Sequence, residues 1–342
     1  MERKRNQSWI ALPVFVFISE WRSCGKISLR PRYSAPTVLG GRSRNTSIYA
    51  LLAAVVFAFG AVLPAAADND TLVKRGAYLV NGPAACANCH TPRAPDFSFL
   101  PGMDYAGGFK QVDPGFTTYS SNITSDRGSG IGAMPDQQII KAIREGNIQG
   151  IVFFPPMPVR TYNNMSDEDV KAIVAYLRTI KPVRHFNQTS TWRIIQPPVP
   201  PARGLPAPPT SDKVAYGGYI VNSLAACFEC HSTRGADKRP DLAHHLGAGG
   251  FEIELAPRKV VRTPNITPDP ETGIGLWSDA DIKIAITKGM TSGGEHLSPP
   301  MPYAFYKNMT AEDLDAVVAY LRTIPPIRNS VERTDFQKEA FP

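Results

Sequence analysis

One short pattern, C-x-x-C-H, constrains this chain more than any other feature. It occurs twice, and its residues are Cys86, Cys89 and His90 in the first copy and Cys227, Cys230 and His231 in the second. Two thiols at this spacing can each add to one vinyl group of a haem, and the histidine that follows can bind the iron. The sequence therefore predicts two covalently bound haem c groups.

Three other chemistries also use closely spaced cysteines. They are a thioredoxin-like redox pair, a zinc site with Cys and His ligands, and two disulfides in an exported protein. A redox pair or a disulfide leaves the histidine of both copies without a role. Because the chain has only five cysteines and six histidines, two such motifs are rare by chance, and this favours haem.

The two motifs lie inside longer segments that repeat. In chain order, the repeated segments are A-G-G-F at 106–109 and 248–251, N-I-T at 122–124 and 265–267, G-I-G at 130–132 and 273–275, P-P-M-P at 155–158 and 299–302, and A-Y-L-R-T-I at 175–180 and 319–324. The displacement between copies stays between 141 and 144 residues. Such a period indicates two homologous domains.

The boundaries of these domains follow from composition. Residues 196–210 carry seven prolines, which predicts a stiff, extended linker with little packing of its own. The predicted organisation is a leader at 1–67, a first domain at 68–195, a Pro-rich linker at 196–212, a second domain at 213–330 and a polar tail at 331–342.

Helical patterns dominate both repeats. Apolar residues recur at helical spacing over 72–80, 135–145, 214–221 and 278–288. Capping signals at Ser166 and Thr310 open helices that run to Ile180 and Ile324, and Ser278 has the spacing of a capping box. Four repeated tyrosines are interpreted as helix-packing residues: Tyr78, Tyr176, Tyr219 and Tyr320. No segment alternates convincingly as a strand, so the sequence predicts an all-α fold.

The positive charge of the chain is concentrated in its first 67 residues. These residues hold nine Lys or Arg against two acidic residues, whereas residues 68–342 hold 28 of each sign. Basic residues, an apolar run from Ile48 to Leu63 and small residues ending at Ala67 follow the order of a secretory signal peptide. The apolar run is shorter than the roughly 20 residues that span a bilayer. We therefore expect cleavage after Ala67, export to the periplasm and a neutral body with no nucleic-acid-binding face.

The occupant of the sixth iron position separates an electron carrier from an enzyme. Met157 and Met301 occupy the same place in the two P-P-M-P segments, where the prolines restrict the loop. These methionines are predicted as iron ligands, although methionine also serves simply to fill a core. His296 lies in the same loop as Met301, where it could form a hydrogen bond near the second haem or, as the second choice, replace Met301. Met165 and Met309, which stand at helix starts, are interpreted as core or haem-contact residues.

In this order, the motifs resemble the multihaem cytochrome c subunits of bacterial periplasmic dehydrogenases. That family includes the cytochrome subunits of alcohol, gluconate and sorbitol dehydrogenases and of some molybdenum hydroxylases. The resemblance covers nearly all of residues 72–327. It implies a class I cytochrome c fold in each half, with His90 and His231 as proximal ligands and Met157 and Met301 as distal ligands.

The resemblance also implies a partner on each side. A periplasmic dehydrogenase is the expected electron donor, and a quinone, a small cytochrome or a terminal oxidase is the expected acceptor. Many such subunits carry three haem domains and a C-terminal membrane helix, whereas two haem domains are predicted here. Direct quinone reduction and peripheral membrane association are therefore left open.

Two function hypotheses follow from the residues. The first is a dihaem electron-transfer protein without substrate chemistry of its own, because both domains offer a closed His/Met site. The alternative is a dihaem peroxidase, which needs one open or displaceable sixth position. The near-identical P-P-M-P loops favour the electron carrier, and His296 is the main asymmetry that favours the peroxidase.

Overall fold

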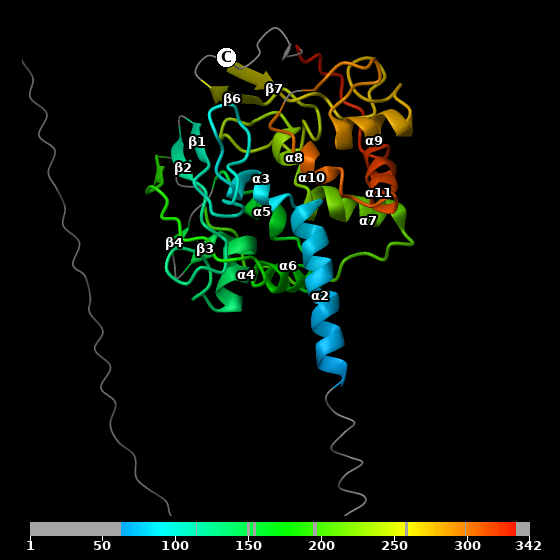
Figure 1. Cartoon of the computed structure of the whole chain (residues 1–342). Coiled ribbons are helices and arrows are strands. Elements are labelled where there is room, and N and C mark those ends of the chain that lie inside the picture. Colours follow the sequence, from blue (N-terminus) through cyan, green and yellow to red (C-terminus); the bar gives the residue numbers. More distant parts are fainter. Residues whose placement is uncertain are drawn as a thin grey trace, which may run out of the picture. The chain divides into compact units, whose positions relative to one another are not determined.

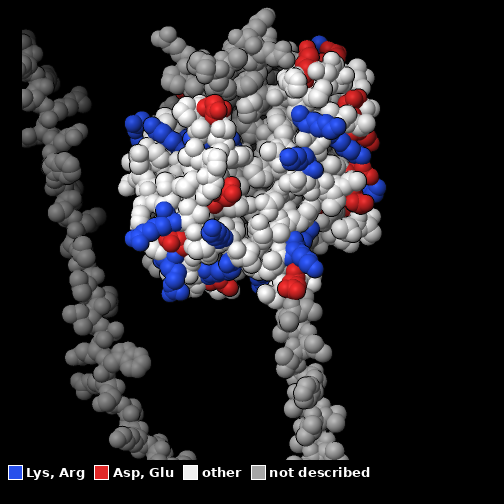
Figure 2. Space-filling model, viewed as in Figure 1, with Lys and Arg blue, Asp and Glu red and all other residues white. Residues whose placement is uncertain are grey.

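The computed structural model describes residues 63–113, 115–148, 151–152, 155–193, 197–256, 259–297 and 299–332. Residues 1–62 of the predicted leader and residues 333–342 of the predicted tail lie outside this range. The first described helix begins at Leu63, so the predicted cleavage point after Ala67 falls within it. Within the described ranges, none of the helices combines the length and the apolar character of a membrane span. On the face shown in Figure 2, basic and acidic side chains are interspersed.

The two halves of the chain contain matching sets of helices (Figure 1). The first half contains α2 (Leu63–Asn81), α3 (Cys86–His90), α4 (Asp136–Glu145), α5 (Val159–Tyr162) and α6 (Asp167–Leu177). The second half contains α7 (Lys213–Tyr219), the π-helix η1 (Ile220–Leu224), α8 (Cys227–Cys230), α9 (Asp279–Lys288), α10 (Tyr303–Tyr306) and α11 (Ala311–Leu321). Each segment predicted as a helix is helical, and most of the predicted helix ends lie within a few residues of the observed ends. Ser278 forms the predicted capping box with Asp281.

The prediction of an all-α fold is wrong, because the described residues also form three small antiparallel sheets. They consist of β1 (Lys110–Asp113), β2 (Phe116–Tyr119) and β5 (Thr191–Trp192); of β3 (Asn147–Ile148) and β4 (Ile151–Val152); and of β6 (Glu252–Ala256) and β7 (Lys259–Arg262). The β1–β2 and β6–β7 hairpins each follow an A-G-G-F segment. Because the strands are so short, none has the sustained alternation by which a strand is recognised in a sequence.

In each half, the first and last helices cross at a glycine. A Cβ atom on Gly76 of α2 would lie 1.9 Å from the carbonyl oxygen of Ala172 in α6. In the second half, a Cβ atom on Gly217 of α7 would lie 1.8 Å from the carbonyl oxygen of Ala316 in α11. The backbones approach so closely that only a residue without a side chain fits, which explains why this glycine is repeated.

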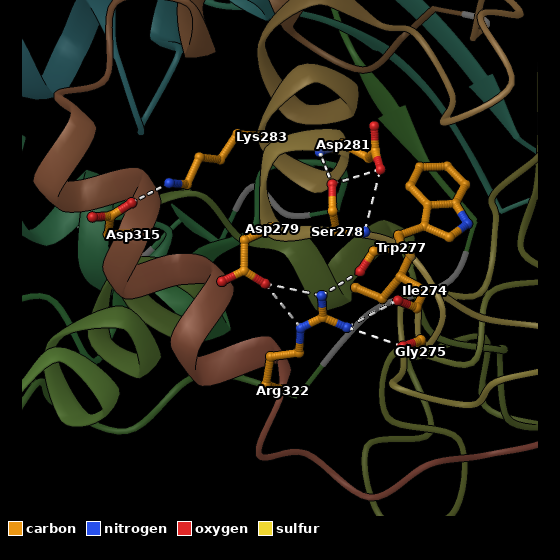
Figure 3. A network of polar contacts seen from close by, with 9 residues as sticks. All are labelled: Ile274, Gly275, Trp277, Ser278, Asp279, Asp281, Lys283, Asp315 and Arg322. Carbon is orange, nitrogen blue, oxygen red and sulfur yellow. Dashed lines mark hydrogen bonds and ion pairs between the residues drawn. The ribbon is translucent and has the colours of Figure 1, made fainter.

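The arginine of the A-Y-L-R-T-I segment joins the last helix to the loop before α9 (Figure 3). Arg322 forms an ion pair with Asp279, the first residue of α9. It also donates to three carbonyl oxygens of the preceding loop, those of Ile274, Gly275 and Trp277. The first half contains equivalent contacts from Arg178 to Ile131, Met134 and Asp136. This repeated arginine therefore supports the domain and not a cofactor.

Two tyrosines join the halves reciprocally. The hydroxyl of Tyr78 in α2 donates to Asp313 at the start of α11 over 2.5 Å, and that of Tyr219 in α7 donates to Asp169 at the start of α6 over 2.7 Å. Each hydroxyl also accepts a bond from the backbone N–H of the N-cap residue of the same helix. Each half therefore supplies a tyrosine hydroxyl that binds the first turn of a helix in the other half. Of these two aspartates, only Asp169 has a further side-chain partner among the described residues: Arg75, which donates two bonds to it.

The proline-rich segment lies along the first half. The carbonyl oxygen of Pro197 accepts from Arg160 over 2.9 Å, and that of Pro200 accepts from Asn163 over 2.9 Å. Both donors lie at α5. Residues 197–209 form no helix or strand, and the segment makes more contact with the domain than its composition suggests.

Candidate haem sites

One continuous cavity of about 2000 Å³ is lined by residues of both halves, including all eight predicted haem residues. Pockets for small molecules usually measure roughly 300–1,000 Å³, so this cavity has room for two large groups. The helices that carry the two C-x-x-C-H motifs, α3 and α8, lie near the middle of the molecule with α5 and α10 (Figure 1).

Each motif histidine is oriented by a backbone carbonyl. His90 Nδ1 lies 2.8 Å from the carbonyl oxygen of Ser121, and His231 Nδ1 lies 2.9 Å from that of Pro264. A carbonyl only accepts, so Nδ1 carries the proton and Nε2 keeps its lone pair for a metal. Burial lowers the pKa of both histidines, which keeps the imidazoles in the neutral form that binds iron.

The repeated N-I-T segment holds these carbonyls in place. Asn122, which follows Ser121, accepts a bond from the backbone N–H of Thr124 and donates to the carbonyl of Val183 beyond the last helix. The second half repeats both bonds with Asn265, Thr267 and Ile327. Both asparagines are buried. The N-I-T segment therefore links the carbonyl that orients the histidine to the residues that follow the last helix of the domain.

In the described structure, none of the four motif cysteines forms a disulfide, which leaves each sulfur for attachment of a haem. Burial raises the pKa of Cys86 and of Cys227 to about 12, and that of Cys230 to about 11. The thiols are therefore protonated at neutral pH. Among the described residues, no three Cys, His, Asp or Glu side chains gather closely enough to hold a metal ion, as the zinc alternative requires.

Met157 and Met301 are half-buried and line the cavity. The backbone turns in the same way after each of them: Val159 N–H donates to the carbonyl of Met157 over 2.8 Å, and Tyr303 N–H to that of Met301 over 2.9 Å. In the first half, the indole of Trp192 also donates to the carbonyl of Pro155. Thiols, an imidazole and a thioether from each half thus face one cavity, and this donor set fits a c-type haem.

His296 lines the cavity in the second half. Its side chain is exposed, and its backbone pairs with Met290 in a β-bridge that corresponds to the β3–β4 hairpin of the first half. Met165 and Met309 are buried in the core, as interpreted, and also reach the cavity wall. The other histidines in the described ranges, His185, His244 and His245, are not part of the wall.

Sequence reasoning missed two repeated tyrosines in the wall. Tyr162 and Tyr306 stand at the same place after the two P-P-M-P segments. Their hydroxyls donate to the carbonyls of Ala84 and Ala225, just before each C-x-x-C-H motif. Burial raises the pKa of both tyrosines. Their exact repetition at a displacement of 144 residues was the signal that could have revealed them.

A repeated arginine in the wall was also missed. Arg93 and Arg234 stand three residues after each motif histidine, and their guanidinium groups lie over Phe99 at 4.2 Å and over Phe251 at 4.0 Å. In the described structure, the Nε atoms of both are buried without a hydrogen-bond partner. A buried donor beside the cavity suits an anionic group, and a haem propionate supplies one.

Two family models match this chain, one in each half. Residues 71–177 match "Cytochrome C oxidase, cbb3-type, subunit III", and residues 218–325 match "Cytochrome c". Each matched region contains one C-x-x-C-H motif, one P-P-M-P segment and the last helix of that half.

Curated relatives align with both halves. The chain is 30% identical over 286 residues to "Alcohol dehydrogenase (quinone), cytochrome c subunit" of Gluconacetobacter polyoxogenes, covering 78% of this chain and 59% of the relative. It is 33% identical over 286 residues to "Fructose dehydrogenase cytochrome subunit" of Gluconobacter japonicus, covering 77% and 54%. It is 28% identical over 259 residues to "Diheme cytochrome c-type" of Cereibacter sphaeroides, covering 71% and 82%. The chain thus spans somewhat more than half the length of the two dehydrogenase subunits.

Proposed function

Because this chain belongs to the c-type cytochromes, with a cytochrome c domain in each half, we propose that it is the dihaem electron-transfer subunit of a periplasmic dehydrogenase. It accepts electrons from the dehydrogenase and passes them to a quinone, a small cytochrome or a terminal oxidase of the respiratory chain. The names of its relatives support a dehydrogenase as the donor.

In this proposal, each half holds its haem with the same set of residues. Each motif cysteine would hold the haem through a thioether bond, formed when its S–H group adds across a vinyl C=C bond without net oxidation. His90 and His231 would bind the iron through Nε2, and Met157 and Met301 would supply a thioether sulfur to each iron. When bound, the haem iron exchanges one electron between its ferrous and ferric forms.

The observation that carries the proposal is the equivalence of the two donor sets around one cavity. Both histidines are oriented by matching carbonyls, and both methionines sit in loops with the same backbone hydrogen bond. Two closed sites of one kind favour electron transfer over catalysis, which requires an open iron position. Since both sets face the same cavity, an electron can pass between them within the protein.

Optical spectroscopy tests the proposal directly. The purified protein is expected to give two c-type haems per chain by pyridine haemochrome, a ferric sulfur-to-iron band in the far red and no spectral shift of the reduced form with carbon monoxide. Met157→Ala and Met301→Ala are each expected to open one haem to carbon monoxide. A stoichiometry below two, or a far-red band that survives the double variant, would contradict the proposed ligands.

A dihaem peroxidase is the second candidate, and His296 is the observation that favours it. This side chain is exposed at the cavity wall of the second half, five residues before Met301 in the chain. Carbon monoxide binding to one haem of the unmodified protein, together with peroxide turnover that His296→Ala removes, would place this candidate first.

A further inference from the structure

The arginine beside each C-x-x-C-H motif holds the segment between the two cysteines. Arg93 donates to the backbone carbonyl of Asn88 over 2.9 Å and to its side-chain oxygen over 2.7 Å. Arg234 donates to the backbone carbonyl of Glu229 over 2.6 Å. Asn88 and Glu229 occupy the same position of the two motifs. The two halves therefore share one architecture at this point but differ in charge.

The charge of the arginine is offset in only one half. The carboxylate of Glu229 lies 3.9 Å from the guanidinium of Arg234, whereas Asn88 offers Arg93 a neutral amide. Within the described ranges, no carboxylate lies within ion-pair distance of Arg93. Burial lowers the pKa of both arginines, as expected for cations withdrawn from water. The positive charge of Arg93 is therefore not offset in the first site, whereas that of Arg234 is offset by Glu229 in the second site.

The position of Glu229 is fixed by contacts from both halves. Its carboxylate accepts a bond from the hydroxyl of Thr161 over 3.0 Å, in addition to its proximity to Arg234. The side chain is about three-quarters buried, with 24% of its surface exposed. Its charge therefore acts through a medium less polar than water, where electrostatic effects are larger than at an exposed surface.

The rest of the described cavity wall has the same asymmetry. Apart from Arg93, Arg234 and Glu229, the first half contributes two basic side chains and one acidic side chain, and the second half contributes three basic and four acidic ones. A negative environment favours the ferric form of a haem because that form carries one more positive charge, and a positive environment favours the ferrous form. Both observations point in the same direction.

We propose that the haem of the second half has the lower reduction potential, and that Glu229 is the positioning charge that sets most of the difference from the first half. The inference rests on the proposed function, since it requires a haem at each motif. In the half-reduced protein, an electron leaves the second haem, which becomes ferric, and reaches the first haem, which becomes ferrous. The second half then faces the dehydrogenase, which supplies electrons, and the first half faces the acceptor.

A spectroelectrochemical titration of the full dihaem protein tests this inference. Two one-electron waves are expected, and Met157→His and Met301→His variants assign each wave to one half by shifting it selectively. Glu229→Gln is expected to raise the reduction potential of the lower wave by ~59 mV. For a one-electron couple, this shift means that the preference of the electron for the first haem falls about tenfold. Asn88→Glu is expected to lower the upper wave by a similar amount. Glu312→Gln, which removes an exposed charge outside the cavity wall, is the matched control and should shift neither wave.

The inference fails if Glu229→Gln moves the upper wave more than the lower one, or moves neither. It also fails if the assigned order of the waves is reversed. The proposed function fails in a different way, by a haem content below two or by the absence of two one-electron waves. Haem content and the far-red band are measured for every variant, so that misfolding is not mistaken for a change in potential.

Discussion

A single absent side chain determines how each domain closes. Gly76 and Gly217 stand where two helices cross so closely that a Cβ atom would lie within 2 Å of a carbonyl oxygen. These glycines lie 141 residues apart, as the repeated motifs do, but repetition alone does not reveal what a residue contacts. The hydrogen bonds of Asn122 and Asn265 illustrate the same limit, because their partners lie about sixty residues further along the chain.

Substitution of the crossing glycines is expected to separate the helices. Gly76→Ala and Gly217→Ala should each lower the free energy of unfolding by about 1–3 kcal/mol or more, because the backbones must move apart. Gly128→Ala is the control, since its nearest neighbour lies 3.6 Å from the added atom. Denaturant unfolding followed by circular dichroism measures all three. Equal stability of Gly76→Ala and Gly128→Ala would show that the crossing tolerates a side chain.

Among the secondary-structure elements, the helices were predictable and the strands were not. The helices carry their own signals, such as the apolar periodicity of α4 and the capping box at Ser278 before α9. The β1–β2 and β6–β7 hairpins are held by strands of four or five residues and by the A-G-G-F loops that precede them. The eight predicted haem residues do line one cavity, whereas the wall residues Tyr162 and Arg93 went unrecognised because they belong to no familiar motif.

The contacts of Arg322 give a prediction about α9 and α11. Arg322→Ala should destabilise the protein by about 1–3 kcal/mol, since three loop carbonyls lose their donor. Asp279→Ala removes only the exposed partner of the ion pair and should cost less than about 1 kcal/mol. Thermal unfolding of the two variants provides the comparison. If Asp279→Ala were the more damaging change, the ion pair would outweigh the carbonyl contacts.

At the scale of the whole molecule, the two reciprocal tyrosine contacts are unequal, and this difference can be tested. Tyr78→Phe should cost about 1–3 kcal/mol, because the buried Asp313 loses its tyrosine donor. Tyr219→Phe should cost less, because Asp169 keeps two bonds from Arg75. The free energies of unfolding in urea, measured at neutral pH, compare the two variants. Costs of equal size would mean that Arg75 does not compensate for the missing hydroxyl.

The same tyrosines predict how stability changes with pH. Burial, together with the neighbouring aspartates, raises the pKa of Tyr78 and Tyr219 above the ordinary value of about 10. The folded protein therefore holds these protons more tightly than the unfolded chain, so their contribution is complete below pH 10 and decreases as the pH rises above it. Urea unfolding between pH 8 and 11 should show a steeper loss of stability for the unmodified protein than for the Tyr78→Phe/Tyr219→Phe double variant. Parallel pH profiles would argue against this role.

The reciprocal contacts also make the chain comparable to a tethered homodimer. Tyr78 reaches Asp313 and Tyr219 reaches Asp169, so the same pair of residue types meets twice in opposite directions, as at an isologous interface. A half-length ancestor with this tyrosine and this aspartate could satisfy both contacts with a second copy of itself. When two copies are fused through the proline-rich segment, their contact no longer depends on the concentration of the protein in the cell. It depends on a fixed effective concentration that the linker sets. Duplication then freed the two copies to diverge, so that residues such as Asn88 and Glu229 could differ while the interface was kept.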